Sequence, residues 1–455
     1  MEKNNLWILT EERPTIVVIK TIIEKSSVLK DLDIHLNNIV IEPVIKNNNF
    51  QHQYIVNNFS SSKIENIIIK TVSGNSSFVD FLVFLQIESP KEEQLLENCI
   101  YAIEDTKTNT NDSRNTAMGQ RSSKFIALDY YIKKYNSNTK TVMMFSDIQA
   151  EKDHRSVLFI NNLLMHLDCG IEFWNKDSSR FKKFNSLEEM IYEKNAIAAT
   201  NTRESDTPIT IIKEGDDIYY VSGKLTKPGK HRKNYNGKIN HDPNVGQIPL
   251  IAYGLRKLGV TGRIIVTDHQ LLNEKVKKVK GNKFSHMASL DYIDLELENC
   301  DLPKTSFSNL YWKYDFESEK ISSIFFQIIL EKQGLKTLFD NHGGCEKSWF
   351  ITDNNERIAI PKKYTKDGGK IPDLIMLSEK NKTIYLYEGK KYKNLDQGIE
   401  EIKRFDKFEL GLLSEYYPNY KYKRGLIIMG GKKSNDVSVH YQIDSDNNLH
   451  FLSKN

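Results

Sequence analysis

Apolar residues in the first half of the chain gather in short runs rich in Ile, Val and Phe, bounded by polar or turn residues. Such runs are typical of buried or half-buried β-strands. The expected strands cover residues 64–72, 78–87, 98–108 and 140–148. Residues 118–135 and 156–168 instead carry apolar positions at helical spacing. The order strand, helix, strand over residues 98–148 predicts a βαβ unit in a sheet covered by helices.

The middle of the chain is less regular. Residues 208–222 predict a β-hairpin that turns at Gly215–Asp217, and residues 224–240 predict a basic, polar loop. We expect Asn244 to cap a helix that runs to Leu258, because Asn is a favoured N-cap residue. A strand over residues 263–269 follows.

The second half repeats the alternation of helices and strands. It predicts helices over residues 319–334 and 396–415, strands over 371–378, 382–392 and 424–431, and a final hairpin over 437–453. The fold class is therefore α/β, with two domains that each contain a mixed central sheet flanked by helices. We place the N-terminal domain at residues 1–300 and the C-terminal domain at residues 310–455.

Composition narrows the class of protein. Hydrophobic residues make up 39% of the 455 residues, enough for buried cores, and 64 Lys and Arg against 60 Asp and Glu give a net charge of +4. The four cysteines are too far apart for a zinc site, and no apolar run is long enough for a membrane span. We expect a soluble cytoplasmic protein that makes no membrane contact.

The same arrangement of charged residues occurs in both halves. Each half has an Asp on one strand and an acid-x-Lys triplet on the next, namely Asp80 with Asp105 and Lys107, and Asp373 with Glu388 and Lys390. Residues i and i+2 of a strand point to the same face, so the acid and the lysine of each triplet project together. A neighbouring strand that carries the Asp would bring two carboxylates and one ammonium group together.

Two carboxylates and a lysine suit one kind of chemistry. Mg²⁺ prefers oxygen ligands and keeps several waters, so Asp80 and Asp105, or Asp373 and Glu388, are candidate metal ligands. The metal would polarise a phosphoryl group and activate water, and the lysine would stabilise the developing charge.

Both triplets resemble the PD-(D/E)xK motif of type II restriction endonucleases and repair nucleases. The C-terminal copy has the literal motif, Pro372-Asp373 with Glu388-Gly389-Lys390, whereas Val79 replaces the proline in the N-terminal copy. The resemblance implies two restriction-endonuclease-like domains and a Mg²⁺-dependent, site-specific double-stranded DNA endonuclease. It also implies a cognate DNA methyltransferase as a functional partner. Two working centres would let one chain cut both strands, and a single one would require a homodimer or sequential nicking.

Polar segments outside the triplets are candidates for DNA contact, because Arg, Lys, Asn and Gln bind phosphates and base edges. One follows the first triplet and the other is the basic loop, and the candidates are Arg114, Asn115, Gln120, Arg121, Lys230, Arg232 and Tyr235.

Three other interpretations stay open at this point. The chain could be a structure-specific or repair nuclease, or a non-catalytic DNA-binding protein with decayed nuclease folds. The triplets could also be cross-strand salt bridges on solvated sheet faces.

Overall fold

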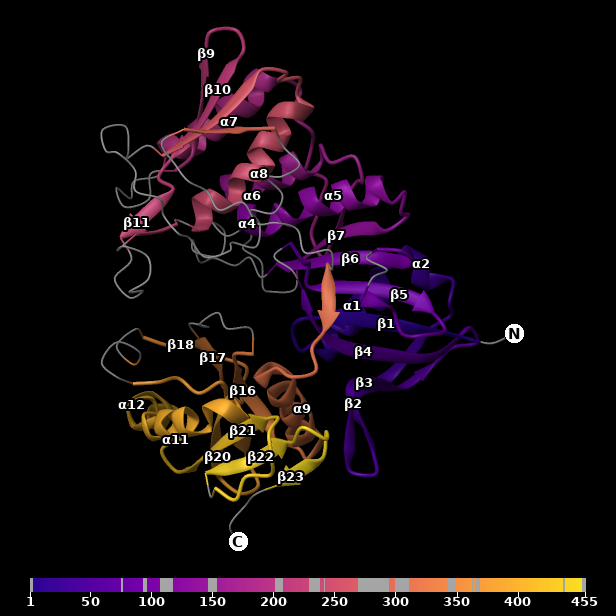
Figure 1. Cartoon of the computed structure of the whole chain (residues 1–455), viewed down its shortest axis with the longest axis vertical. Helices are drawn as coiled ribbons and strands as arrows, with labels where there is room; N and C mark the ends of the chain where they lie inside the picture. Colours follow the sequence, from indigo (N-terminus) through magenta and orange to yellow (C-terminus); the bar gives the residue numbers. More distant parts are fainter. Residues whose placement is uncertain are drawn as a thin grey trace. The chain divides into compact units, whose positions relative to one another are not determined.

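The computed structural model describes residues 3–74, 77–92, 96–106, 118–145, 154–200, 208–228, 238–240, 242–268, 294–298, 311–342, 349–361, 364, 369–436 and 438–451. They form mixed α/β structure, with several mixed sheets flanked by helices (Figure 1). This confirms the expected fold class at that level.

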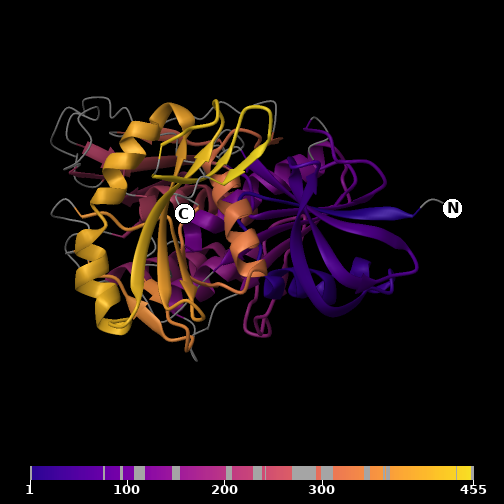
Figure 2. The ribbon, with the colours of Figure 1, turned by 90° about the horizontal axis from the view of Figure 1, so that it is seen from below.

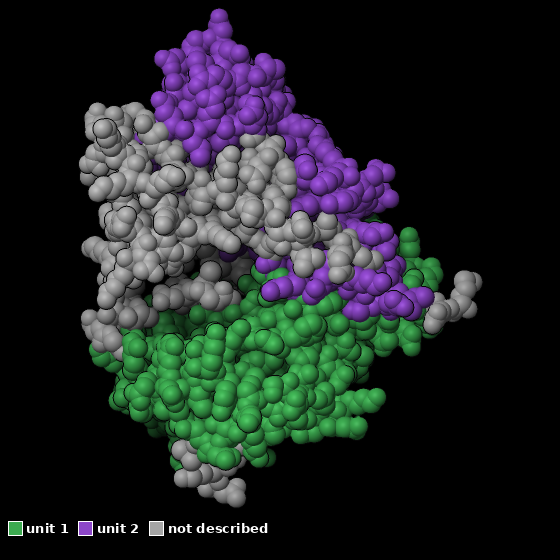
Figure 3. All heavy atoms as spheres, viewed as in Figure 1, with its two compact units in different colours: residues 1–73, 314–455 green, residues 74–313 purple. Residues whose placement is uncertain are grey.

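The chain divides into two compact units. Unit 1 comprises residues 1–73 and 314–455, and unit 2 comprises residues 74–313 (Figure 3). The sequence predicts one domain over residues 1–300, whereas the first 73 residues belong to the same compact unit as the C-terminal part. Contacts inside unit 1 explain this grouping: the Phe50 amide donates to the Asn447 carbonyl at 2.9 Å, and the centroids of the Phe50 and Phe325 rings lie 4.1 Å apart.

Unit 1 holds two groups of strands. Its strands are β1 (Asn4–Thr10), β2 (His35–Lys46), β3 (Asn49–Ser60), β4 (Ile64–Gly74), β16 (Lys336–Asp340), β17 (Trp349–Ile351), β18 (Arg357–Ala359), β19 (Leu374–Ser378), β20 (Thr383–Lys391), β21 (Lys421–Met429), β22 (Val439–Ile443) and β23 (Leu449–Phe451). One group runs in the order β2-β3-β4-β1, and the other in the order β16-β19-β20-β21-β22-β23. In the second group β19 and β20 are antiparallel, and β20, β21 and β22 are parallel.

Helices cover both faces of this second group. The helices of unit 1 are α1 (Ile16–Lys25), α2 (Ser27–Lys30), α9 (Glu319–Lys332), α11 (Leu395–Lys403), α12 (Asp406–Phe408) and α13 (Ser414–Tyr416), with a 3₁₀ turn over Tyr392–Asn394 and a π-helical turn over Glu409–Leu413. Seen from below, α9 lies on one side of β20 and β21, and α11 to α13 lie on the other (Figure 2). The side with α11 buries the apolar residues Phe405, Leu413 and Ile428.

The ends of α9 follow from local sequence. The Ser318 hydroxyl accepts a hydrogen bond from the Ile321 amide and caps the helix, as Ser does at many N-termini. Gly334, two residues beyond the last helical residue, adopts a φ of +85°, which glycine tolerates without strain. Apolar side chains at helical spacing, including Ile321, Phe325 and Ile328, are buried.

Unit 2 is built around a strand group of the same kind. Its strands are β5 (Phe81–Gln86), β6 (Cys99–Thr106), β7 (Lys140–Phe145), β8 (Glu172–Trp174), β9 (Thr210–Glu214), β10 (Ile218–Gly223), β11 (Thr226–Pro228), β12 (Lys238–Asn240), β13 (Arg263–Asp268) and β14 (Glu296–Glu298), and β15 (Trp312–Tyr314) lies at its boundary with unit 1. Strands β5 and β6 are antiparallel, whereas β6, β7 and β8 are parallel. A second sheet has the order β14-β13-β10-β9.

The helices of unit 2 lie between and after these strands. They are α4 (Met118–Ser122), α5 (Lys124–Lys134), α6 (Arg155–Leu164), α7 (Leu187–Ala199) and α8 (Asp242–Lys257). Because α4 and α5 connect the parallel strands β6 and β7, the predicted βαβ unit is confirmed.

Most of the predicted elements are present, with three differences. The predicted loop over residues 224–240 contains the short antiparallel strands β11 and β12. The helix expected over residues 396–415 is interrupted after Lys403 and continues as α12, a π-helical turn and α13. The prediction that Asn244 caps a helix is wrong, because α8 already begins at Asp242 and the Asn244 side chain donates to the Lys224 carbonyl.

Within the described residues, no helix has both the length and the apolar character needed to cross a membrane. Cys99 and Cys169 are free thiols, and Cys300 and Cys345 lie outside the described residues.

Candidate active site

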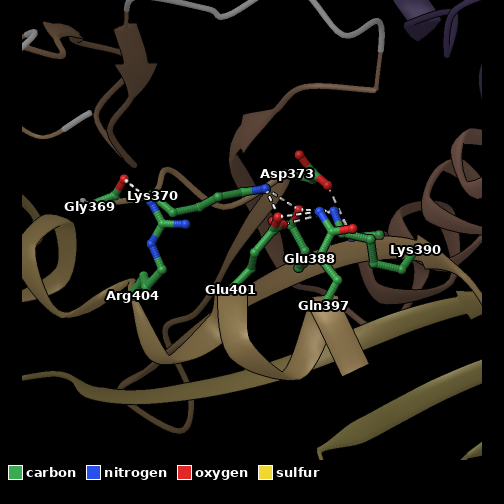
Figure 4. A network of polar contacts seen from close by, with 9 residues as sticks. Gly369, Lys370, Asp373, Glu388, Lys390, Gln397, Glu401 and Arg404 are labelled. Atoms are coloured by element: carbon green, nitrogen blue, oxygen red, sulfur yellow. Dashed lines mark hydrogen bonds and ion pairs between the residues drawn. The ribbon is translucent and has the colours of Figure 1, made fainter. Parts of the chain in front are cut away.

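The C-terminal triplet lies where β19 and β20 pair in unit 1. Leu374 is opposite Tyr387, so Asp373, one residue earlier, stands opposite Glu388. Directly opposed residues of an antiparallel pair point to the same face. Lys390, two residues after Glu388, shares that face. The predicted convergence of Asp373, Glu388 and Lys390 is therefore present in the structure (Figure 4).

Hydrogen bonds hold the three side chains in place. The Asp373 carboxylate accepts from the Gly389 amide at 3.1 Å, and the Lys390 ammonium donates to Oε1 of Glu388. The Glu388 side chain is fully buried and that of Lys390 is 10% exposed. These residues therefore do not form a salt bridge on a solvated sheet face, the weakest kind of ion pair.

Glu401 and Lys370 complete the cluster and were missed by the sequence reasoning. Glu401, on α11, accepts hydrogen bonds from Lys390 at 3.0 Å and from Gln397 at 2.7 Å (Figure 4). Lys370 donates to both Glu388 and Glu401. A partial signal existed, since Gln397 and Glu401 stand at the i, i+4 spacing of one helix face. Nothing in the sequence pattern pointed to Lys370.

The segment that carries Lys370 is anchored to the end of α11. The Lys370 amide donates to the Arg404 carbonyl at 3.3 Å, and the Arg404 guanidinium donates to the Gly369 carbonyl at 3.4 Å. Lys370 is therefore held over Glu388 by two backbone contacts in addition to its own ion pairs.

The pKa values of the acids in this cluster depart from their ordinary values. Burial, followed by the charge of Asp373, raises the pKa of Glu388 to about 8. Burial also raises the pKa of Asp373. Burial alone would raise the pKa of Glu401 as well, but hydrogen bonds with Glu388, Lys370, Gln397 and Lys390 lower it overall.

The lysine of the triplet stays charged. Burial lowers the pKa of Lys390, but the carboxylates of Glu388 and Glu401 outweigh this effect and raise the pKa overall. Three carboxylates facing two ammonium groups leave one negative charge when every group is ionised. An additional positive charge at this position would be stabilised.

The donor set fits a hard divalent cation at one position. Oε2 of Glu388 is buried and has no hydrogen-bond partner among the described residues. A buried carboxylate oxygen without a donor is costly, and a cation would satisfy it. Asp373 and Glu388 are hard oxygen ligands of the kind Mg²⁺ takes alongside several waters. In the part of the chain that is described, no three or more His, Cys, Asp or Glu side chains form a metal-binding group. A metal ion at this position would therefore be coordinated by two carboxylates of the protein.

The N-terminal triplet has a different geometry. Asp80 lies beside Asp105, but it accepts from the Asp105 backbone amide at 2.7 Å. The side chain next to Asp80 is that of Glu104, which is 1% exposed and bound by the Lys124 ammonium at 2.7 and 2.9 Å. Strand alternation directs Asp105 to the other face, so the expected convergence of Asp80 with Asp105 is not found. Lys107 lies outside the described residues.

The candidate DNA-contact residues are described only in part. Gln120 and Arg121 lie on α4. A Cβ added at Gly246 of α8 would lie 2.6 Å from the Cβ of Gln120, and the Arg121 guanidinium donates to the Thr106 hydroxyl at 3.4 Å. Both side chains therefore have contacts inside unit 2. The remaining candidates lie outside the described residues, namely Arg114, Asn115, Lys230, Arg232 and Tyr235.

No protein-family model matches the chain, and no curated protein or solved structure shows a significant match to it.

Proposed function

We propose that this protein is a Mg²⁺-dependent endonuclease that hydrolyses phosphodiester bonds of double-stranded DNA at specific sequences, in the manner of a type II restriction enzyme. The observation that carries the proposal is that Asp373 stands opposite the buried Glu388, with Lys390 on the same face. The proposal includes two restriction-endonuclease-like domains, a cytoplasmic location and a cognate methyltransferase that protects host DNA.

Each side chain of the cluster has a role in this proposal. Asp373 and Glu388 would hold Mg²⁺, and the Gly389 amide fixes the orientation of the Asp373 carboxylate. Mg²⁺ would supply Lewis acidity and lower the pKa of a bound water. The Lys390 ammonium would stabilise charge that develops on the phosphate oxygens. Glu401 is a positioning residue, because it holds Lys390 next to Glu388.

The test is cleavage of supercoiled plasmid and phage DNA by the purified protein, with Mg²⁺ or with EDTA. We expect discrete fragments with Mg²⁺ and none with EDTA. Asp373→Asn and Lys390→Met should each lower the cleavage rate by a factor on the order of 100 to 1,000. Lys391→Met is the matched control, because Lys391 is the adjacent lysine on the other face of β20 and should leave the rate unchanged.

Other outcomes separate the competing functions. Cleavage restricted to branched or single-stranded substrates would identify a structure-specific or repair nuclease. Tight DNA binding without Mg²⁺-stimulated cleavage would identify a non-catalytic DNA-binding protein. Equal cleavage by wild type, Asp373→Asn and Lys390→Met would overturn the assignment of this site.

A further inference from the structure

The two units pair their strands in the same register around the buried acid. In unit 1, the pairing of Leu374 with Tyr387 sets Asp373 opposite Glu388. In unit 2, Phe81 pairs with Ile103, which sets Asp80 opposite Glu104. Opposed residues share a face, so each unit directs one Asp and one Glu to the same side of its sheet.

A second, independent contact gives the same correspondence. The Asp373 carboxylate accepts from the amide of Gly389, the residue after Glu388, at 3.1 Å. The Asp80 carboxylate accepts from the amide of Asp105, the residue after Glu104, at 2.7 Å. By both criteria Glu104 occupies the position of Glu388, and Asp105 occupies that of Gly389.

The surroundings of the two glutamates also match. Glu104 is 1% exposed, and Glu388 is fully buried. Each lies on a strand with an antiparallel neighbour on one side and a parallel neighbour on the other.

The ammonium group comes from a different element in unit 2. The position of Lys390 is taken by Thr106, whose hydroxyl accepts from Arg121. The cation next to Glu104 is Lys124, from the first turn of α5, which contacts both carboxylate oxygens. A helix on the sheet face thus supplies the charge that a strand residue supplies in unit 1.

We infer that Asp80, Glu104 and Lys124 form a second site for a divalent cation and a DNA phosphate. This inference deepens the proposed function and rests on it. The site replaces the set of Asp80, Asp105 and Lys107 expected from the sequence. Lys124 already occupies both oxygens of Glu104, whereas Oε2 of Glu388 has no partner among the described residues. A cation must therefore displace Lys124 in part, and it binds more weakly here than at Glu388.

The test is a titration of the full-length protein with Mn²⁺, followed by the electron paramagnetic resonance signal of the free ion. Wild type should bind two ions per chain in two affinity classes. Glu104→Gln should lose the weaker class and Glu388→Gln the tighter one. Asp105→Asn, the matched control, should keep both classes. Thermal unfolding would verify that each variant is folded.

A second variant keeps the test informative if Glu104→Gln fails to fold. Lys124→Met removes the competing ammonium group, so the weaker class should bind Mn²⁺ about three- to tenfold more tightly, a change that a purely structural salt bridge would not produce. The inference is overturned if Glu104→Gln retains both classes, if Asp105→Asn loses one, or if Lys124→Met leaves the weaker class unchanged. In each of these cases the proposed function still stands if two results hold. Glu388→Gln must lose one class of Mn²⁺ sites, and the wild-type protein must cleave DNA only in the presence of Mg²⁺.

Discussion

The clusters of unit 1 and unit 2 place an Asp and a Glu on the same type of strand pair but surround the Glu with different cations. Glu388 meets Lys390 from its own strand and Lys370 from the preceding segment, and one of its oxygens has no partner among the described residues. Glu104 meets Lys124 from a helix, and both of its oxygens are occupied. The acid pair thus follows from strand register, whereas the source of the ammonium group depends on which helix covers the sheet.

The other face of the two strands differs as well. Gly389 lies against α9, where an added Cβ would come within 2.5 Å of the Ser323 hydroxyl. The corresponding position in unit 2 holds Asp105, a residue with a full side chain. The close approach of α9 to β20 therefore explains why unit 1 has a glycine between its acid and its lysine.

The largest expected effect of substitutions in the two clusters is on DNA strand cleavage. If each unit cuts one strand, Glu388→Gln and Glu104→Gln should each convert linear plasmid product into nicked circles, and the double variant should lower total cleavage on the order of 1,000-fold. Agarose gel electrophoresis of a supercoiled plasmid measures this. Linear product from both single variants would show that the two units do not each cut one DNA strand.

The pH dependence of stability should be the same for both clusters. The pKa of each glutamate is raised to about 8 from its ordinary value of 4.5. Between these values the folded protein holds a proton that the unfolded chain has lost, so the free energy of unfolding decreases as the pH rises. The slope is at most about 1.4 kcal/mol per pH unit for each group.

Urea unfolding in EDTA from pH 5 to pH 8 measures this slope. Glu388→Gln and Glu104→Gln should each flatten the decrease, because glutamine does not titrate. Added Mg²⁺ should restore stability at pH 8, since it binds the ionised carboxylates. A wild-type stability that stays constant over this range would contradict the burial of both acids.

A smaller effect is expected at the glycine of unit 1. Gly389→Ala should lower the free energy of unfolding by about 1–3 kcal/mol, because its methyl group would clash with Ser323. Ser323→Ala in the same chain removes the obstructing hydroxyl and should recover most of this loss. Thermal or urea unfolding of the single and double variants checks the close packing, and equal losses in both would show that Ser323 is not the obstacle.

The smallest effect is expected at Lys370, the second lysine that contacts Glu388. Lys370→Met removes a positive charge next to Glu388, so the Mg²⁺ concentration needed for half-maximal cleavage should fall about three- to tenfold. Lys391→Met serves again as the control. An increase in the required Mg²⁺ would mean that Lys370 assists metal binding instead of competing with it.

The sequence was sufficient to predict most of the fold because apolar runs such as those of β4, β6 and β7 are long and regular. It was sufficient to predict the grouping of Asp373, Glu388 and Lys390. Glu388 and Lys390 are related by strand alternation, and no acid adjacent to Glu388 could take its place opposite Asp373. The sequence was insufficient to predict the acid pair of unit 2. There Glu104 and Asp105 are adjacent acids, and only the register with β5 decides which one faces Asp80.

Long-range contacts were also beyond the sequence pattern. Lys124 and Lys370 reach their glutamates from outside the acid-bearing strand, and no local spacing indicates such a contact. The grouping of residues 1–73 with the C-terminal part likewise depends on contacts such as Phe50 with Phe325.

The proposed function requires Asp373 and Glu388 to hold a divalent cation together beside Lys390. Anomalous X-ray diffraction from crystals soaked in Mn²⁺, which shares the oxygen-ligand preference of Mg²⁺, locates the ion directly. We expect an anomalous peak within about 2.0–2.4 Å of one oxygen from each carboxylate, with Oε2 of Glu388 among the ligands. A crystal that contains Mn²⁺ elsewhere but shows no peak between Asp373 and Glu388 would contradict it.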